Sequence, residues 1–164
     1  MSVQLSSQVV WQELQNELFA VLGMVTASGE ARTIGVVYIV RDQKLYIVTG
    51  KETWKARHCQ QNPDVSITVP ISKRIPIMPW VKIPPATISF SGKASVLDAK
   101  DSDPDIVRAI TPGLEADSEK LTSLCVIEIN PVGEFITYGV GVSLLTMRDN
   151  EKARARSSIM NDGK

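Results

Sequence analysis

The strongest constraint on the fold is a run of three short apolar segments within about thirty residues, separated only by tight turns. The segments span residues 19–26, 33–40 and 44–49, and they are rich in Val, Ile and other residues that favour strands. Ser28-Gly29-Glu30 and Asp42-Gln43 supply the turns between them. Parallel strands need a long crossover between them, so strands this close together must pair antiparallel. The sequence therefore predicts an antiparallel sheet.

The rest of the chain adds more short strands and a few short helices. Further strands are expected at 65–69, 87–97, 124–129 and 134–138, the last two joined by a turn at 130–133. Helices are expected at 7–17, 53–61 and 104–110, with Ser6 or Ser7, Thr53 and Asp103 as their N-caps. The pattern predicts a mainly-β barrel or sandwich of about seven strands with two or three small helices.

Length and composition fit one globular domain spanning residues 1–164. Its first 17 residues are expected to carry a helix, and residues 148–164 to form a flexible tail. The 18 basic and 18 acidic residues cancel, so we expect no nucleic-acid or membrane partner. The N-terminus lacks the pattern of a signal peptide and no apolar run is long enough to span a bilayer, which favours a cytoplasmic location.

Metal and nucleophile chemistry find little support in the residue types. Cys59 and Cys125 have no metal-ligand spacing, and His58 is the only histidine, so we expect no metal site and no Ser/His/Asp triad. Asp101, Asp103 and Asp105 alternate, but Pro104 and the missing downstream ligands argue against a calcium loop. We therefore name no catalytic residue from the sequence.

One stretch has the features of a phosphate site. A strand ends at Thr49, Gly50 follows, and a helix begins with Thr53 and Lys55 in its first turn. Free backbone N–H groups and the positive end of a helix dipole bind anions at such a position. The alternative is that Thr53 only caps the helix and the basic residues only form its solvated face. Gly50-Lys51 lacks the remaining residues of a nucleotide-triphosphate loop, and no dinucleotide fingerprint follows a strand.

Several local motifs resemble those of a known family. The motifs are Thr26 with Gly29 and Arg32, the strand ending at Thr49, Thr53-Trp54-Lys55, Asn62-Pro63-Asp64-Val65, and the segment 90–98. Together they resemble the pyridoxamine 5′-phosphate oxidase-like, FMN-binding split β-barrel family, over roughly residues 15–100. The resemblance implies an antiparallel split barrel of six to seven strands in a Greek-key-like order, with short peripheral helices.

The resemblance also implies a cofactor site in a cleft between the two subunits of a homodimer. Arg32, Thr49, Thr53 and Lys55 would surround the FMN phosphate and ribityl chain, while backbone at Thr33, Ile34 and Gly35 would flank the ring. Val48, Trp54 and Trp80 complete the expected cofactor-binding set. Trp80, in a Pro-rich segment, is expected either to close over the ring, to pack on the partner subunit, or to plug one end of its own barrel.

The sequence thus predicts an FMN-binding flavoprotein, with oxidoreductase chemistry carried by the flavin. Pyridoxamine phosphate oxidase activity itself is not expected. Trp54 stands where those enzymes carry a basic residue, and their substrate-binding pattern is not evident in residues 140–158. The alternative is a non-catalytic module that holds flavin, deazaflavin or haem, with His58 the sole imidazole for a haem iron. A cofactor-free scaffold is a third possibility.

Overall fold

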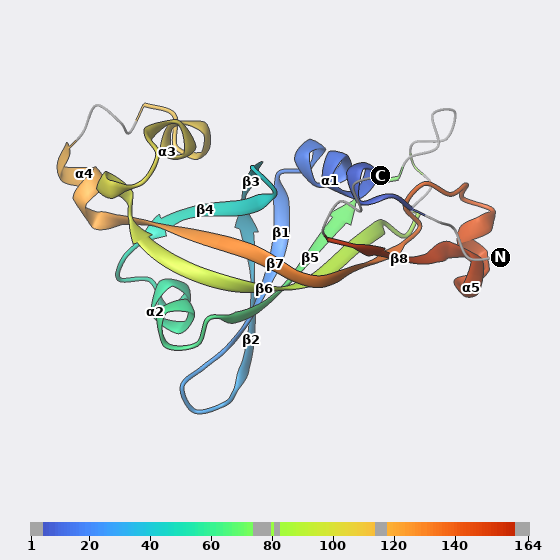
Figure 1. Cartoon of the computed structure of the whole chain (residues 1–164), viewed down its shortest axis with the longest axis horizontal. Coiled ribbons are helices and arrows are strands. Elements are labelled where there is room, and N and C mark those ends of the chain that lie inside the picture. Colours follow the sequence, from blue (N-terminus) through green and yellow to red (C-terminus); the bar gives the residue numbers. More distant parts are fainter. Residues whose placement is uncertain (1–4, 74–79, 81–82, 114–117, 160–164) are drawn as a thin grey trace. The chain divides into compact units, whose positions relative to one another are not determined.

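The computed structural model describes residues 5–73, 80, 83–113 and 118–159. Strands dominate, and the helices are short (Figure 1). The strands are β1 (Phe19–Val25), β2 (Ala31–Val37), β3 (Ile39–Arg41), β4 (Lys44–Gly50), β5 (Asp64–Ile71), β6 (Ala86–Asp98), β7 (Leu124–Tyr138) and β8 (Arg154–Ser158). The helices are α1 (Ser7–Asn16), α2 (Trp54–Gln61), α3 (Pro104–Ile110), α4 (Ser118–Ser123) and α5 (Asn150–Ala153), with 3₁₀ turns η1 (Ala99–Asp101) and η2 (Thr146–Arg148).

The strands form a single hydrogen-bonded sheet in the order β2-β1-β5-β6-β7-β4-β3, with β8 pairing β7. The pairs β1–β2, β3–β4, β4–β7 and β7–β8 are antiparallel. The predicted fold class, a mainly-β antiparallel split barrel with short helices, is confirmed. The described residues give eight strands, where the sequence predicted six to seven.

The second predicted strand, residues 33–40, divides at Tyr38. The Tyr38 side chain is buried, and the Tyr38 backbone N–H donates to the Leu18 carbonyl oxygen at 3.0 Å. Before Tyr38 the chain pairs with β1, and after it the chain pairs with β4. The turn between β3 and β4 has positive φ at both Asp42 (49°) and Gln43 (58°). That backbone matches the right-handed twist of the two strands, which fixes the register Arg41↔Lys44.

Two predictions about the C-terminal third are wrong. The expected turn at 130–133 is absent, because β7 runs without interruption and Gly133 takes up a positive φ of 82° within it. Residues 149–158 are no free tail either, since they form α5 and β8. In β8 the small residues Ala155 and Ser157 are buried and the arginines between them are exposed, the alternation of a half-buried strand.

Contacts divide the chain into two compact units. The first comprises Met1–Glu17, Thr68–Phe90 and Gly133–Lys164; the second comprises Leu18–Ile67 and Ser91–Val132. Strands β5, β6 and β7 each contribute residues to both. The one-domain assignment therefore stays a prediction. In the described part of the chain, no helix is long and apolar enough to cross a membrane.

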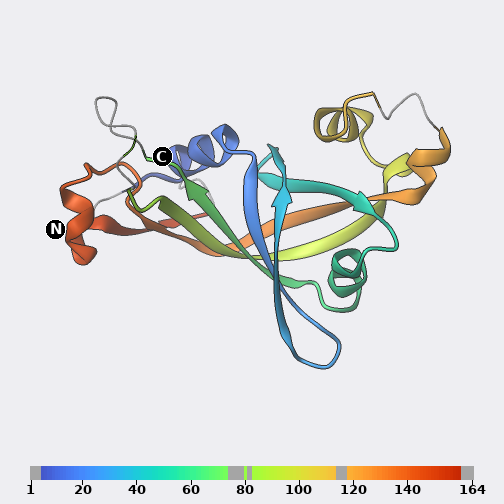
Figure 2. The ribbon, with the colours of Figure 1, turned by 180° about the vertical axis from the view of Figure 1, so that it is seen from behind.

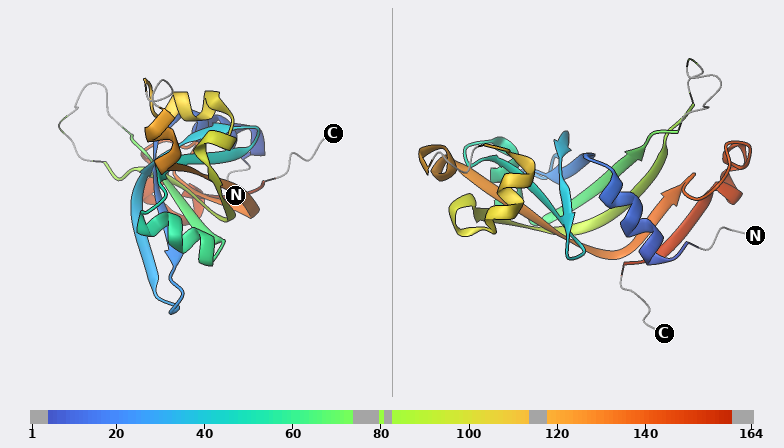
Figure 3. Two further views of the ribbon diagram at one scale, coloured as in Figure 1. Left: turned by 90° about the vertical axis from the view of Figure 1, so that its left-hand side faces the viewer. Right: turned by 90° about the horizontal axis from the view of Figure 1, so that it is seen from above.

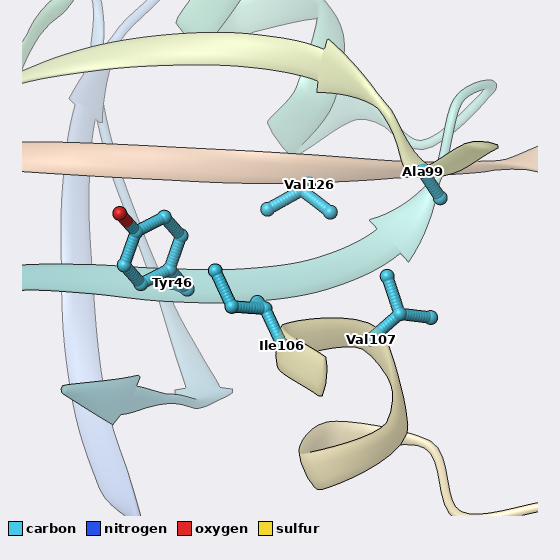
Figure 4. Packing of buried hydrophobic residues seen from close by; sticks show 5 residues of the cluster. All are labelled: Tyr46, Ala99, Ile106, Val107 and Val126. Atoms are coloured by element: carbon cyan, nitrogen blue, oxygen red, sulfur yellow. The ribbon is translucent and has the colours of Figure 1, made fainter. Parts of the chain in front are cut away.

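Each unit has its own packed interior. In the second unit, α3 covers β4 and β7 through a cluster of Tyr46, Ala99, Ile106, Val107 and Val126 (Figure 4).

In the first unit, the rings of Trp11 and Phe90 each meet the Phe135 ring at nearly a right angle, with centroids 5.2 and 5.3 Å away. Helix α1 lies beside β8 (Figure 3), where the Ser7 hydroxyl and the Trp11 indole N–H both donate to the Ile159 carbonyl oxygen.

Candidate functional site

The predicted phosphate-binding segment lies in the second unit, where β4 leads into α2. Helix α2 begins after Thr53, whose extended backbone (φ −71°, ψ 143°) is typical of an N-cap, and it ends before Asn62-Pro63. Ala56 and Cys59 are its buried residues. Seen from behind, α2 lies next to the β1–β2 hairpin (Figure 2). The strand-turn-helix arrangement predicted from the sequence is confirmed.

The structure brings the two predicted threonines together. Thr49 Oγ1 lies 3.3 Å from Thr53 Oγ1, and Thr53 Oγ1 donates to the Gly50 carbonyl oxygen at 2.8 Å. Because the Thr53 hydroxyl hydrogen points at Gly50, the hydrogen between the two hydroxyls comes from Thr49. Thr49 is almost fully buried, so this pair fixes the end of β4 to the start of α2.

Thr53 occupies the N-cap position without capping the helix. Its side chain makes no cap hydrogen bond, and the first turn-closing bond is Arg57 N–H to the Thr53 carbonyl oxygen at 3.2 Å. Among the described residues, no acceptor is found for the backbone N–H groups of Trp54, Lys55 and Ala56, although Ala56 is fully buried. Unpartnered N–H groups at a helix start carry partial positive charge and bind anions.

Lys55 is the cation nearest to these donors in sequence, and its charge is uncompensated. No carboxylate of the described residues pairs with it, while its neighbours are neutralised: Lys51 Nζ lies 2.7 Å from Asp98 Oδ1, and Arg57 pairs with Glu52. The Lys51 ammonium also donates a hydrogen bond to Asp98, and that bond together with its positive charge holds the pKa of Asp98 below its ordinary value. Lys55 therefore adds a free positive charge to the helix start.

Trp54 is the first residue of α2 and lies partly open to solvent. Its ring meets His58 edge-on, with centroids 5.7 Å apart and an interplanar angle of 63°. His58 Nδ1 is buried and has no hydrogen-bond partner among the described residues. The two rings stabilise each other along one side of the helix.

The predicted β2 residues divide between the two faces of the hairpin. Arg32 and Ile34 share one face, Thr33 and Gly35 the other, because strand side chains alternate. Arg32 pairs with Glu30 at 2.7 Å, and no hydrogen bond or ion pair of the described residues joins it to α2. Its contact with the cofactor phosphate stays a prediction.

Sequence reasoning missed the aromatic ring that covers this segment. A Cβ built on Gly35 would lie 2.7 Å from the Phe19 ring, so the ring rests directly on the glycine backbone. Phe19 itself is half exposed. Phe19 lies two residues before Val21, the residue that pairs with Gly35. The sequence could point to the contact only through this pairing, and the pairing becomes known only with the strand register.

Two predicted residues are not brought to the α2 start. Val48 alternates with Thr49 and packs on the α3 cluster, the opposite face of β4. Trp80 belongs to the first unit and is 75% exposed, and its neighbours at 74–79 and 81–82, including much of the Pro-rich segment, lie outside the described residues. The roles of both in cofactor binding stay predictions.

The two cysteines lie between α2 and the sheet. Cys125 is opposite Thr49 in the β4–β7 ladder, and Cys59 is on the buried side of α2. Both are free thiols. Burial raises the pKa of Cys59 to about 11, with Cys125 adding to the effect, and burial also raises the pKa of Cys125. Such thiols are poor nucleophiles, so they serve packing. Within the described ranges no cluster of potential ligands would hold a metal ion.

Comparisons with known proteins identify a matching family and similar folds. A family model described as pyridoxamine 5′-phosphate oxidase matches residues 8–137. No curated protein matches the sequence.

Solved structures of similar fold include three with informative descriptions. A putative pyridoxamine 5′-phosphate oxidase from Listeria innocua has 21% identity, covers 77% of this chain and 94% of its own, and gives a TM-score of 0.57. The haem storage protein HutZ from Vibrio cholerae has 15% identity, covers 86% and 98%, and gives 0.62. A protein described as an F420 reductase has 15% identity, covers 76% and 93%, and gives 0.55. At these identities the likeness shows the fold.

Proposed function

The chain belongs to the pyridoxamine 5′-phosphate oxidase family. On that premise we propose that it is a flavoprotein that binds FMN, with the FMN phosphate at the start of α2. The proposal extends to oxidoreductase activity at a cofactor held in a homodimer cleft. Family membership makes flavin binding plausible, and the F420 reductase among the similar structures has a redox function by its description.

The observation that carries the proposal is the free positive end of α2. Within the described ranges, three N–H groups have no acceptor and Lys55 has no carboxylate partner, and all of them belong to the first turn of one helix. Six other basic side chains of the second unit already have carboxylate partners, namely Arg32, Arg41, Lys44, Lys51, Arg57 and Lys93, so an anion would be drawn to this position. The residues present therefore fit a phosphate group.

The roles of the chain's own residues follow from that placement. Lys55 would supply a charge-assisted hydrogen bond, and the N–H groups of residues 54–56 would orient the phosphate. The Thr53 hydroxyl can rotate from the Gly50 carbonyl oxygen to the anion, since the Thr49 hydroxyl still donates a hydrogen bond to Thr53 Oγ1. A bound flavin would supply the hydride and electron chemistry. We assign no acid or base.

An exposed apolar face on the β1–β2 hairpin supports a homodimer. Phe19 and Val37 are each about half exposed and lie directly across from each other in the ladder. Contiguous exposed apolar side chains are typical of protein interfaces. A second copy of the chain covering this face would also shield the backbone near Gly35, the segment proposed to flank the flavin ring.

The second candidate is a module that holds a cofactor without turnover. HutZ, by its description a haem storage protein, shares the fold. For haem, His58 is the only imidazole in the chain, and its Nδ1 is buried, so only Nε2 is left for an iron. A His58→Ala protein that keeps full haem binding would remove this candidate.

An absorption spectrum of the purified protein tests the proposal, with mass spectrometry of any small molecule released on denaturation. A flavin spectrum together with a released flavin nucleotide is the expected result. A Soret band would favour the haem module, and a released deazaflavin would replace FMN as the cofactor. A colourless protein that also fails to bind added FMN would overturn the flavoprotein proposal.

A further inference from the structure

An ion pair at the turn between β4 and α2 removes one lysine from the charge that an anion would meet there. Lys51 Nζ lies 2.7 Å from Asp98 Oδ1, at the end of β6, and Lys100 Nζ lies 3.9 Å from the other oxygen of the same carboxylate. The side chains of Lys51 and Asp98 are 31% and 41% exposed. Those of Arg57 and Glu52, the other ion pair of this segment, are 58% and 89% exposed. Solvent therefore screens the attraction between Lys51 and Asp98 less.

The backbone of Lys51 is held in place independently of that ion pair. Its N–H donates to the Ser123 carbonyl oxygen at 2.9 Å, directly after Gly50, the last residue of β4. The Thr53 N–H in turn donates to the Gly50 carbonyl oxygen at 3.1 Å, which closes the turn before α2. Loss of the Asp98 carboxylate would therefore release the ammonium group of Lys51 and leave the turn in place.

The buried Cys125 thiol lies within reach of all the charges concerned. Cys125 is opposite Thr49 in the β4–β7 ladder, and the Thr49 hydroxyl contacts the residue that precedes α2. Burial raises the pKa of Cys125, Asp98 adds to the rise, and Lys51 and Lys55 oppose it. Lys51 and Asp98 thus act with opposite sign on one point at the end of β4, where Lys55 also acts. Without Asp98, the charge of Lys51 would add to that of Lys55.

Resting on the proposed function, we propose that Asp98 is a positioning residue that sets the selectivity of the site for a phosphate by holding Lys51 away from it. Lys55 then supplies the charge-assisted contact to the phosphate. The site binds the anion less tightly than it would with both lysines free. A carboxylate that does not touch the ligand thereby determines how strongly the protein prefers a flavin with a phosphate to one without.

Fluorescence titrations with FMN and with riboflavin, on full-length protein stripped of cofactor, test this role. Asp98→Asn should raise FMN affinity about 5- to 10-fold, between the effect of an exposed ion pair and that of a hydrogen bond to a charged group, with riboflavin affinity unchanged. Lys51→Met should lower FMN affinity by a similar factor, because the Asp98 carboxylate is then unpaired. The Asp98→Asn/Lys51→Met double variant should bind FMN about as tightly as wild type.

Asp64→Asn is the matched control, because it removes a carboxylate that pairs with Lys93 beyond the other end of α2. It should change neither affinity.

Two kinds of result would overturn the role of Asp98. One is an Asp98→Asn protein that binds FMN no more tightly than wild type, or in which both affinities change equally, as a purely structural role would give. The other is a double variant that stays as weak as Lys51→Met, because Lys51 would then contact the phosphate in wild type in spite of its ion pair. A wild type that binds riboflavin as tightly as FMN would instead overturn the proposed phosphate site itself.

Discussion

At the scale of single residues, the ion pair between Lys51 and Asp98 decides which lysine near the start of α2 carries a free charge. Thr49, Thr53 and Lys55 were predictable because a strand end, a glycine and a helix start follow one another within seven residues. The pairing of Lys51 with Asp98 was not, since the two are far apart in sequence and meet only through the folded sheet. That ion pair is the reason Lys55, and not Lys51, carries the free charge.

The buried thiols make a residue-scale prediction about pH. In the native protein the pKa of Cys59 is about 11, above the ordinary thiol value of an unfolded chain. Between those two values the unfolded state releases a proton that the native state keeps, so the free energy of unfolding falls as pH rises from about 9 to about 11. Denaturant titrations across this range should show the fall, and Cys59→Ala should flatten it.

Thiol labelling checks the same point independently. Neither cysteine should react with a thiol reagent at pH 8 until the protein is unfolded, because both are buried and protonated. Rapid labelling of one thiol in the native protein would contradict the packing role assigned to the pair.

At the scale of elements, turn-forming residues predict a chain reversal correctly at one position and wrongly at another. The Asp42-Gln43 turn was predictable because the alternating strands on both sides require a reversal there. Residues 130–133 contain the same kinds of turn-forming residue, yet β7 continues through them, and only tertiary pairing decides between the two cases. Strand β8 escaped prediction because its buried positions are Ala155 and Ser157, too small and polar to form an apolar pattern.

The Gln43→Gly substitution tests the β3–β4 turn. Gln43 has φ 58°, a conformation that costs energy for any residue with a Cβ and none for glycine. We expect the variant to gain about 0.5–1 kcal/mol in free energy of unfolding, measured by urea denaturation. Gly29 offers the converse control, because Gly29→Ala at φ 83° should lose stability. A loss of stability in Gln43→Gly would mean that the turn differs from the one described.

At the scale of the whole molecule, the proposed homodimer follows from a face that one chain leaves open. Val37 is 54% exposed, in an apolar part of the β1–β2 hairpin. Val37→Asp would place a charge in the proposed interface and should convert the protein to monomer, as measured by light scattering, with its circular dichroism unchanged. Ser95→Asp, a change at an exposed position on β6, is the control, and this variant should still have the mass of a dimer. A monomeric wild type would contradict the homodimer.

The central claim, that α2 and Lys55 bind the phosphate of a flavin, is tested most directly by comparing FMN with riboflavin, which lacks the phosphate. In fluorescence titrations wild type should bind FMN much more tightly than riboflavin. Lys55→Ala should lower FMN affinity by about 10- to 100-fold, the effect of one lost hydrogen bond to a charged group, while riboflavin affinity stays the same. Arg57→Ala, on the same helix but paired with Glu52, should change neither. Equal loss of both ligands in Lys55→Ala, or no preference for FMN in wild type, would contradict the account.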